Sequence, residues 1–216
     1  LAELARLTPS EVLIVENVDE KVIEAIKENG ATATQRGKSA FDSTSGEDRL
    51  KTLFSVSSLD AFGGFSRSQI SALGALAEYL DATQKGKLPI LRPPRVELKA
   101  ASMQIDAATR RNLELTKSIN KGTKHGSLLG TIDLTVTAAG GRLLERRISS
   151  PSMDLALIKN RHQALEFLID NVDLSENLIT LLKSAPDLER ALSRVSLDRA
   201  GPRDLANICR SLVQGK

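Results

Sequence analysis

The stretch that decides the fold covers residues 103–148, which open with MQIDAATRRNLEL (103–115) and close with SLLGTIDLTVTAAGGRLLERRI (127–148). In the closing part, apolar residues recur in steps of three and four, which is the spacing of one buried helix face. The pattern predicts one long helix from near Ser127 to Ile148, which Ser149-Ser150-Pro151 would end. The predicted face consists of Leu129, Ile132, Val136, Ala139 and Leu143.

Two adjacent glycines, Gly140 and Gly141, interrupt this predicted helix. Each glycine costs a helix interior about 1 kcal/mol relative to alanine. We therefore expect either a closely packed backbone or a bend at this point.

The residues after Ser150 read as a series of further helices, each with its own start signal. The expected signals are Ser152 as a cap, Asp173 with Glu176 as a capping box, and Pro186 and Pro202 as first-turn prolines. The last of these helices would carry an apolar stripe made of Leu205, Ile208, Cys209 and Leu212.

The first part of the chain has a strand–helix–strand pattern. Residues 12–15 form a short apolar run typical of a buried strand, and residues 31–35 suit a second strand. Between them, Asp19 can cap a helix that Asn29-Gly30 would end. This order favours a small parallel α/β piece.

Two more helices are expected before a proline-rich segment. One covers Glu47–Phe54 after a polar loop at residues 38–46, and a glycine-rich turn follows at residues 60–64. The other starts at a Ser66/Gln69 capping box, runs to about Thr83 and ends at Gly86. Proline excludes helix from residues 88–94, which we interpret as an inter-domain linker, and residues 96–105 should be extended.

These residues resemble a known family. The run 106–115 is similar to the opening of the core, or lever, domain of MutS, the DNA mismatch-repair recognition family. Residues 4–15, 58–63 and 79–91 resemble the second half of its connector domain. The family usually has a single glycine before Arg142-Leu143-Leu144, where this chain has two. Further similar positions are 127–129, 133–135, 141–144, Pro151, 186–190 and 202–205.

The resemblance implies a mainly α fold. Residues 1–92 would be the later part of an RNase H-like α/β connector domain, and residues 93–216 the first part of an all-α helical core/lever array. The chain would couple mismatched-DNA binding to an ATPase domain that it does not itself contain, so this part would not be an enzyme. In the family, the partners are mismatched double-stranded DNA, MutL and a second subunit, the cofactors are ATP and magnesium, and the location is the nucleoid in the bacterial cytoplasm.

Composition agrees with a globular protein and excludes some function classes. Aromatic residues make up 3% and tryptophan is absent, which argues against a base-stacking single-strand binder. The net charge of +3 permits a nucleic-acid partner without requiring one. A single cysteine excludes an internal disulfide and suits a reducing compartment. We see no signal peptide and no span-length apolar run, and a start within an apparent helix favours a piece of a longer protein.

Gly37-Lys38-Ser39 matches only half of a phosphate-binding P-loop. The full motif needs a glycine five positions before Gly37, and Thr32 occupies that position. An ordinary loop is the preferred interpretation. A small NTPase that uses these residues stays open as an alternative.

No catalytic, cofactor-binding or metal-binding residue can be assigned. The two histidines and one cysteine have no ligand spacing. We expect His125 in an exposed loop, His162 at a core or boundary position, and Cys209 as a small buried hydrophobe.

Two basic clusters could bind phosphates. Arg142, Arg146 and Arg147 are close in sequence, and the first two lie one helical turn apart. Compensation of the helix dipole and solvation explain the same placement. The loop cluster of Lys117, Lys121 and Lys124 is equally ambiguous, so a stand-alone helical nucleic-acid-binding module is the second alternative.

Overall fold

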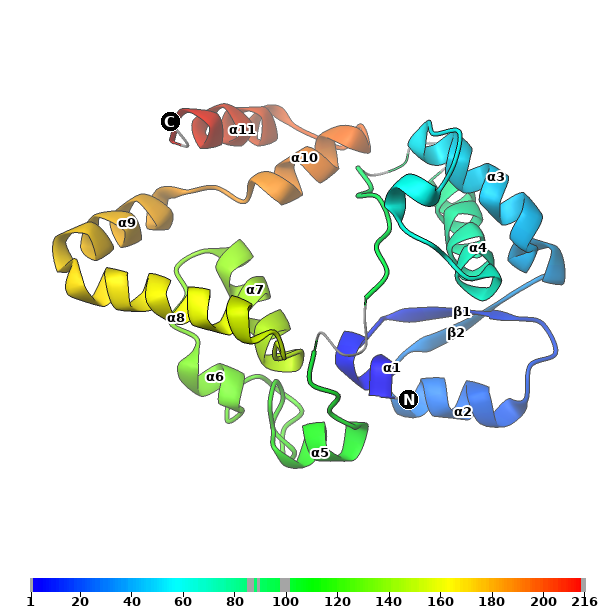
Figure 1. Cartoon of the computed structure of the whole chain (residues 1–216), viewed down its shortest axis with the longest axis horizontal. Coiled ribbons are helices and arrows are strands. Elements are labelled where there is room, and N and C mark those ends of the chain that lie inside the picture. The colour runs from blue at the N-terminus through cyan, green and yellow to red at the C-terminus, as the bar shows by residue number, and fades with distance from the viewer. Residues whose placement is uncertain (1, 85–87, 89, 98–101, 215–216) are drawn as a thin grey trace.

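The computed structural model of the chain describes residues 2–84, 88, 90–97 and 102–214. Its N-terminal region contains α1 (Ala2–Leu7), β1 (Glu11–Val15), α2 (Glu20–Glu28), β2 (Thr32–Arg36), the 3₁₀ turn η1 (Lys38–Phe41), α3 (Ser43–Phe54), η2 (Asp60–Phe62) and α4 (Arg67–Gln84). Its C-terminal region contains α5 (Ala107–Asn112), α6 (Leu128–Ile132), α7 (Ala138–Ser149), α8 (Leu155–Asp170), α9 (Val172–Ser184), α10 (Leu188–Ser196) and α11 (Pro202–Gln214). The expectation of a mainly α fold with one small α/β piece is confirmed (Figure 1).

The strand–helix–strand unit forms as predicted. β1 and β2 pair in parallel over their whole length, with Glu11 opposite Thr32. The side chain of Asp19 accepts a hydrogen bond from the backbone N–H of Lys21 and so caps α2. Gly30 follows the helix with a φ of +78°, a left-handed conformation that glycine adopts without steric cost. The core beneath this unit contains Ile14, Ile26 and Ala31.

Helix α3 begins four residues earlier than the sequence indicated. The carboxylate of Asp42 accepts from the backbone N–H of Ser45 at 2.7 Å, and this cap starts the helix at Ser43 rather than Glu47. The capping box of α4 is confirmed, because Ser66 and Gln69 each accept a hydrogen bond from the other's backbone N–H. The expected stop at Gly86 lies outside the described residues.

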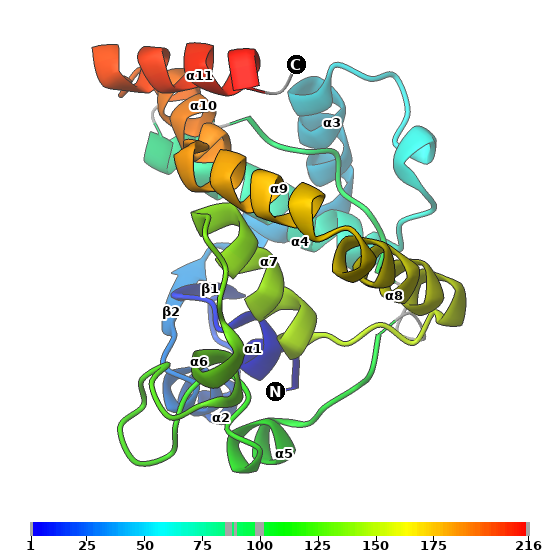
Figure 2. The same cartoon turned by 90° about the vertical axis from the view of Figure 1, so that its left-hand side faces the viewer.

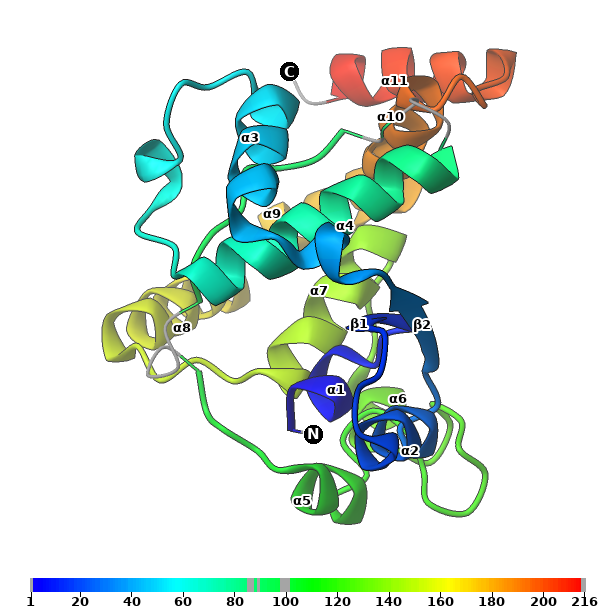
Figure 3. The same ribbon diagram turned by 90° about the vertical axis from the view of Figure 1, so that its right-hand side faces the viewer.

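Helices α3 and α4 cross at two glycines. A Cβ on Gly74 would lie 2.4 Å from the Cα of Gly46, so Gly74 has no room for a side chain at this helix separation, and a Cβ on Gly46 would be tight at 3.1 Å from Ile70 O. Figure 3 shows the two helices side by side above the sheet. Below the crossing, Leu50, Leu59 and Ala77 form the second apolar core of the N-terminal region.

Charged and phenolic side chains join α4 to the sheet and to α3. Glu78 accepts from Arg36 of β2 at 3.0 Å and from Arg49 of α3 at 2.8 Å. The hydroxyl of Tyr79 donates to Glu11 of β1 at 2.7 Å. Hydrogen bonds from Thr34 and then Tyr79 lower the pKa of Glu11. These contacts make the N-terminal region one connected body.

The proline-rich segment has the expected non-helical form where it is described. Leu91 and Pro94 line a cavity of about 200 Å³ together with α3 and α4, so the segment lies against the N-terminal region. Beyond it, Ser102 forms an antiparallel bridge with Ser152, and the N–H of Met103 donates to Pro151 O at 2.8 Å. Residues 98–101 lie outside the described part, so the expected extension over 96–105 is tested at its ends alone.

The prediction of one long helix over residues 127–148 is wrong. The pattern divides into α6 and α7, because Asp133 accepts hydrogen bonds from both the N–H and the hydroxyl of Thr135. Such local side-chain bonds compete with helical ones, and the following β-branched residues disfavour helix further. Thr137 then caps α7 by accepting from Gly140 N–H at 3.0 Å. We expected close packing or a bend at Gly140 and Gly141 within one long helix. Instead, Gly140 lies in the first turn of the separate helix α7.

The C-terminal helices exist as expected, but most of their start signals differ. Asp154 caps α8 instead of Ser152, Asn171 precedes α9 without a side-chain cap bond, and Asp187 caps α10 one residue after Pro186. The first-turn proline of α11, Pro202, is confirmed. An aspartate directly before the first helical residue caps more effectively than a serine farther away, because its carboxylate reaches two or three free N–H groups.

The apolar faces of α8, α9 and α11 are largely uncovered by the described residues. Figure 2 shows α8 and α9 as an outer layer of the molecule. His162 and Cys209 are exposed, so their expected burial is wrong, whereas His125 is exposed as predicted. None of the described helices has the length and apolar character to cross a membrane. The more exposed apolar side chains include Leu155, Leu165, Phe167, Ile169, Val172, Leu181, Leu205, Leu212 and Val213.

Replacing Gly74 with alanine should destabilise the N-terminal region. The new methyl group must push against the Gly46 backbone, and overpacking of this kind costs about 1–3 kcal/mol. The gain of about 1 kcal/mol in helix propensity offsets part of this cost. Urea unfolding followed by the fluorescence of Tyr79, the one tyrosine in a chain without tryptophan, reports on this region. Gly64→Ala is the control, since its methyl group would meet open space; equal midpoints for the two variants would contradict the prediction.

Asp133 should titrate with a pKa of about 2, because the hydrogen bond from Lys124 and those from Thr135 favour its charged form. A carboxylate with a lowered pKa stabilises the fold above the unfolded value of 3.8, and this contribution is lost as the pH falls toward 2. Carboxyl NMR signals measured against pH test this. Lys124→Met should raise the pKa of Asp133, and Lys121→Met should leave it in place. An Asp133 that titrates at its ordinary value in the unmodified chain would refute the expectation.

Candidate functional site at the junction of the two regions

A bidentate ion pair joins α7 to the start of α10. Arg142 donates from Nη1 to Asp187 Oδ2 at 2.9 Å and from Nη2 to Asp187 Oδ1 at 3.0 Å, a bidentate geometry. Asp187 also accepts from the backbone N–H of Arg190 at 3.3 Å. The hydrogen bond from Arg142 lowers the pKa of Asp187, and the same bond raises the pKa of Arg142. One carboxylate therefore begins α10 and attaches it to α7.

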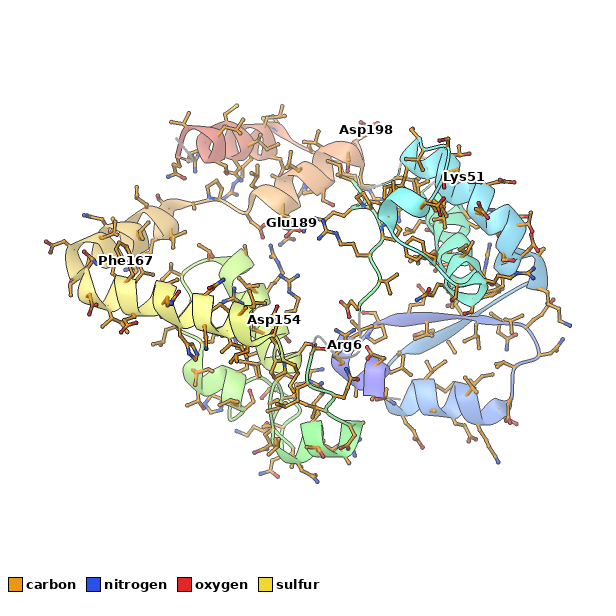
Figure 4. The ribbon with its side chains drawn as sticks, viewed as in Figure 1. Arg6, Lys51, Asp154, Phe167, Glu189 and Asp198 are labelled. Carbon is orange, nitrogen blue, oxygen red and sulfur yellow. The ribbon has the colours of Figure 1, made fainter. Side chains whose placement is uncertain are left out.

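Glu189 extends this contact to the linker. It accepts from Arg142 Nη2 at 3.4 Å and from Arg92 Nη2 at 3.3 Å. Figure 4 shows Glu189 on the side of α10 that faces the linker and α7. We call Arg92, Arg142, Asp187 and Glu189 the junction network, because it connects the segment leaving the N-terminal region with two helices of the C-terminal region.

The contacts of the junction network differ in strength. The Asp187 side chain is 20% exposed and held by two parallel hydrogen bonds, whereas the Arg92 side chain is 85% exposed and makes one long contact. Exposed ion pairs contribute about 0–1 kcal/mol and are screened by salt. The Arg142–Asp187 pair is therefore the firmer of the two contacts, and the Arg92–Glu189 contact is the weaker one.

A second contact between the regions lies at α1. Arg6 donates to Glu3 at 2.7 Å and to Glu97 at 3.0 Å, and its side chain is mostly buried. Burial alone would lower the pKa of Arg6, but the bond with Glu3 and the charges of Glu97 and Glu3 raise it above its ordinary value. Figure 4 shows Arg6 on α1, at the edge of the N-terminal region that faces α7.

The predicted arginine cluster is divided by the structure. Arg142 is occupied by carboxylates, whereas Arg146 and Arg147 face a cavity of about 230 Å³ together with Arg6 and Arg161. Arg146, Arg147 and Arg161 form no ion pair with any described residue. The cationic surface thus consists of α7 and α8 residues, and Arg142 has a structural partner.

The lysine cluster is divided as well. Lys124 pairs with Asp133, and Lys117 lines a different cavity beside α5. Lys121 is exposed on the loop between them. The three lysines therefore do not act as one patch.

Gly37-Lys38-Ser39 does not form a P-loop. Lys38 and Ser39 lie in the short 3₁₀ turn η1, and the next α-helix begins at Ser43. A P-loop places the Lys-Ser pair directly at the N-terminus of a helix, whose free N–H groups hold the phosphates. Thr32, at the position of the missing glycine, is the first residue of β2. Within the described part of the chain, His, Cys, Asp and Glu side chains form no group of three that could hold a metal ion.

The contacts of Asp187, Glu189 and Arg92 have no signature in the sequence. Asp187 and Glu189 lie in the stretch 186–190 that resembles the MutS family, but the partner of Asp187 is 45 residues away. A cap signal at Asp187 could have been read from its position before an apolar helix, but its pairing with Arg142 has no local signature.

Family comparisons match both regions. The family description MutS domain II matches residues 1–92, and MutS domain III matches residues 108–216, which is half of the chain. The chain belongs to the MutS family. The helical C-terminal region thus corresponds to domain III, and the unit built around β1 and β2 belongs to domain II of this family.

Curated relatives in the MutS family are similar over the whole chain. The DNA mismatch repair protein MutS of Cereibacter sphaeroides (strain ATCC 17025) is 53% identical over 216 residues, which is 100% of this chain and 24% of the relative. The protein of the same name from Roseobacter denitrificans is 52% identical over 212 residues, or 98% of this chain and 24% of the relative. The chain spans about a quarter of the length of these relatives.

The Arg142–Asp187 pair should show a measurable coupling energy. A double-mutant cycle with Arg142→Met and Asp187→Asn, followed by urea unfolding and circular dichroism, should give about 0.5–1 kcal/mol. Asparagine caps a helix as well as aspartate does, so the cycle isolates the ion pair from the cap. The matched cycle replaces Arg142→Met with Arg146→Met, which should not couple to Asp187. Equal coupling energies in the two cycles would show that the bidentate contact contributes nothing.

Proposed function

We propose that residues 1–92 are the later part of a connector domain and that residues 93–216 are the first part of a core, or lever, domain in a DNA mismatch repair protein. In this proposal the chain transmits movement between a part that binds mismatched DNA and a part that hydrolyses ATP. The chain itself performs no catalytic step; its role is mechanical.

The junction network is the observation that supports this role. It joins a compact N-terminal body to an open helical array through side chains that can exchange partners, since Glu189 is shared by Arg92 and Arg142. Packed bodies linked by such contacts shift between discrete arrangements rather than deforming smoothly. An effector that binds at one end and favours one arrangement therefore changes the affinity for a ligand at the other end. The size of that change is the coupling free energy between the two sites.

The proposal extends to a whole protein that carries this segment. Its partners would be mismatched duplex DNA, MutL and a second copy of the same protein, and other parts of it would hold ATP and magnesium. Its place would be the bacterial cytoplasm at the nucleoid. These properties rest on the family membership and on the name shared by the curated relatives.

The test is made in the whole protein. Glu189→Gln removes the charge shared by the linker and α7, so mismatched DNA should still bind while the change in ATP turnover that it causes falls by about two- to fivefold. Glu176→Gln removes the same charge from an exposed site on α9 and should leave turnover unchanged. If the two variants behave alike, the junction network does not carry the coupling.

A stand-alone nucleic-acid-binding module is the second candidate. It is favoured by Arg146, Arg147 and Arg161, which line one cavity and form no ion pair with any residue that the structure describes. Such a module would bind duplex DNA with an affinity that falls steeply with salt, and Arg146→Met would reduce that slope. A coupling segment should bind DNA weakly, with the same affinity for matched and mismatched duplexes. The same titration therefore separates the two functions.

A further inference from the structure

A cavity of about 230 Å³ lies where α1 of the N-terminal region meets the end of α7 (Figures 1 and 3). Arg6 of α1, Glu97 and Arg161 of α8 form part of its wall. Residues three, four and seven positions apart lie on the same face of a helix, and one such face of α7 forms much of the rest. The residues of this face are Leu143, Arg146, Arg147 and, directly after the helix, Ser150.

Three arginines of this wall offer guanidinium groups that are open to solvent. Arg146, Arg147 and Arg161 form no ion pair or side-chain hydrogen bond with any described residue. Arg146 and Arg147 are exposed. Arg161 is partly buried, but its nitrogens are not among the buried atoms that lack a partner, so they also remain in contact with solvent. The donors are therefore accessible to a ligand that enters the cavity.

Serine hydroxyls line the cavity beside the arginines. Ser102 and Ser152 form the antiparallel bridge between two distant parts of the chain, and both belong to the wall together with Ser150. Ser152 Oγ accepts from the backbone N–H of Asp154 at 3.2 Å, and its O–H has no acceptor among the described residues. A hydroxyl whose oxygen accepts one bond can still donate another. The wall thus adds neutral donors to positively charged ones.

Carboxylates near the cavity do not neutralise the three arginines. Glu97 is the one acidic residue in the described part of the wall, and it is bonded to Arg6, as is Glu3. This trio has two negative charges and one positive charge. Asp154, directly before α8, is bonded to backbone N–H groups in the first turn of that helix. The three positive charges therefore exceed the one negative charge left by the trio and the one of Asp154.

Compensation of helix dipoles explains part of this arrangement but not Arg161. Arg146 and Arg147 lie in the last turn of α7, where cations are favoured. Arg161 lies beyond the first turn of α8 and far from its last, and the dipole acts within those turns alone. Glu145 lies on the opposite side of α7, about 150° from the midpoint of Arg146 and Arg147, because each residue turns a helix by about 100°. The arginines of the two helices thus converge without an acidic partner.

We propose that this cavity binds one phosphate group, which Arg146, Arg147 and Arg161 hold by donating from their guanidinium nitrogens. A planar guanidinium donates two parallel hydrogen bonds to the oxygens of such a group. The cavity accommodates a phosphate with several waters, since a water molecule takes about 30 Å³ in the liquid. The bound group connects α7 with α8. Its source is either a free ion or the backbone of a nucleic acid, and the site does not depend on the mechanical role proposed above.

A titration of the 216-residue chain with inorganic phosphate, at constant ionic strength set with chloride, tests the site. The NMR signals of the Arg147 and Arg161 Nε–H groups should shift saturably and with one common affinity. Arg161→Met should weaken phosphate binding by about tenfold or more, because a charge-assisted hydrogen bond is lost. Lys159→Met is the matched control, since it removes one positive charge from an exposed position of the same helix outside the cavity wall. It should leave phosphate affinity unchanged.

A short duplex DNA provides the second arm of the test. If the duplex moves the same signals and inorganic phosphate displaces it, the occupant is a backbone phosphate; if the duplex leaves them in place while phosphate moves them, the occupant is a free ion. Both results support the site. The proposal is wrong if both probes leave the signals in place, or if Lys159→Met weakens binding as much as Arg161→Met. The signals of the unmodified chain decide the matter even if Arg161→Met fails to fold.

Discussion

The bidentate contact between Arg142 and Asp187 is the constraint that attaches the start of α10 to α7. In the described part of α10, Ala191 is the buried residue, so apolar burial does little to hold this helix in place. Asp187 both begins α10 and attaches it to α7, and a carboxylate at a helix N-terminus is favoured by the free N–H groups and the helix dipole. This charged pair therefore contributes to the placement of α10, which also packs against α11.

The N-terminal region is held together in a different way. There two apolar cores and the close approach of Gly46 and Gly74 hold α3 and α4 together. Close packing makes this region a rigid body, because displaced backbones would lose dispersion contacts on both sides. The molecule thus combines a rigid piece with an array whose internal contacts are polar and replaceable.

This combination suits the mechanical role proposed for the chain. Movement of a rigid body is transmitted where something attaches to it, and among the described residues the ion pairs Arg6–Glu97 and Arg92–Glu189 are two such attachments. Both include an exposed partner, so each contributes little free energy alone and responds to salt. Small differences in free energy between arrangements are what an effector of modest affinity can overcome.

The sequence by itself determined the local elements and the family. The strand–helix–strand unit, the Ser66/Gln69 capping box and the MutS resemblance were all readable, because each depends on residues within a few turns or on a motif in order along the chain. The exposure of His162 and the partner of Arg142 were decided by the tertiary structure, whereas the break at Asp133 comes from local hydrogen bonds with Thr135 that apolar spacing does not record. Apolar spacing says that a face could be buried, but not whether another helix covers it. Arg142 and Asp187 lie 45 residues apart, and no local pattern records which distant carboxylate the folded chain brings to a given arginine.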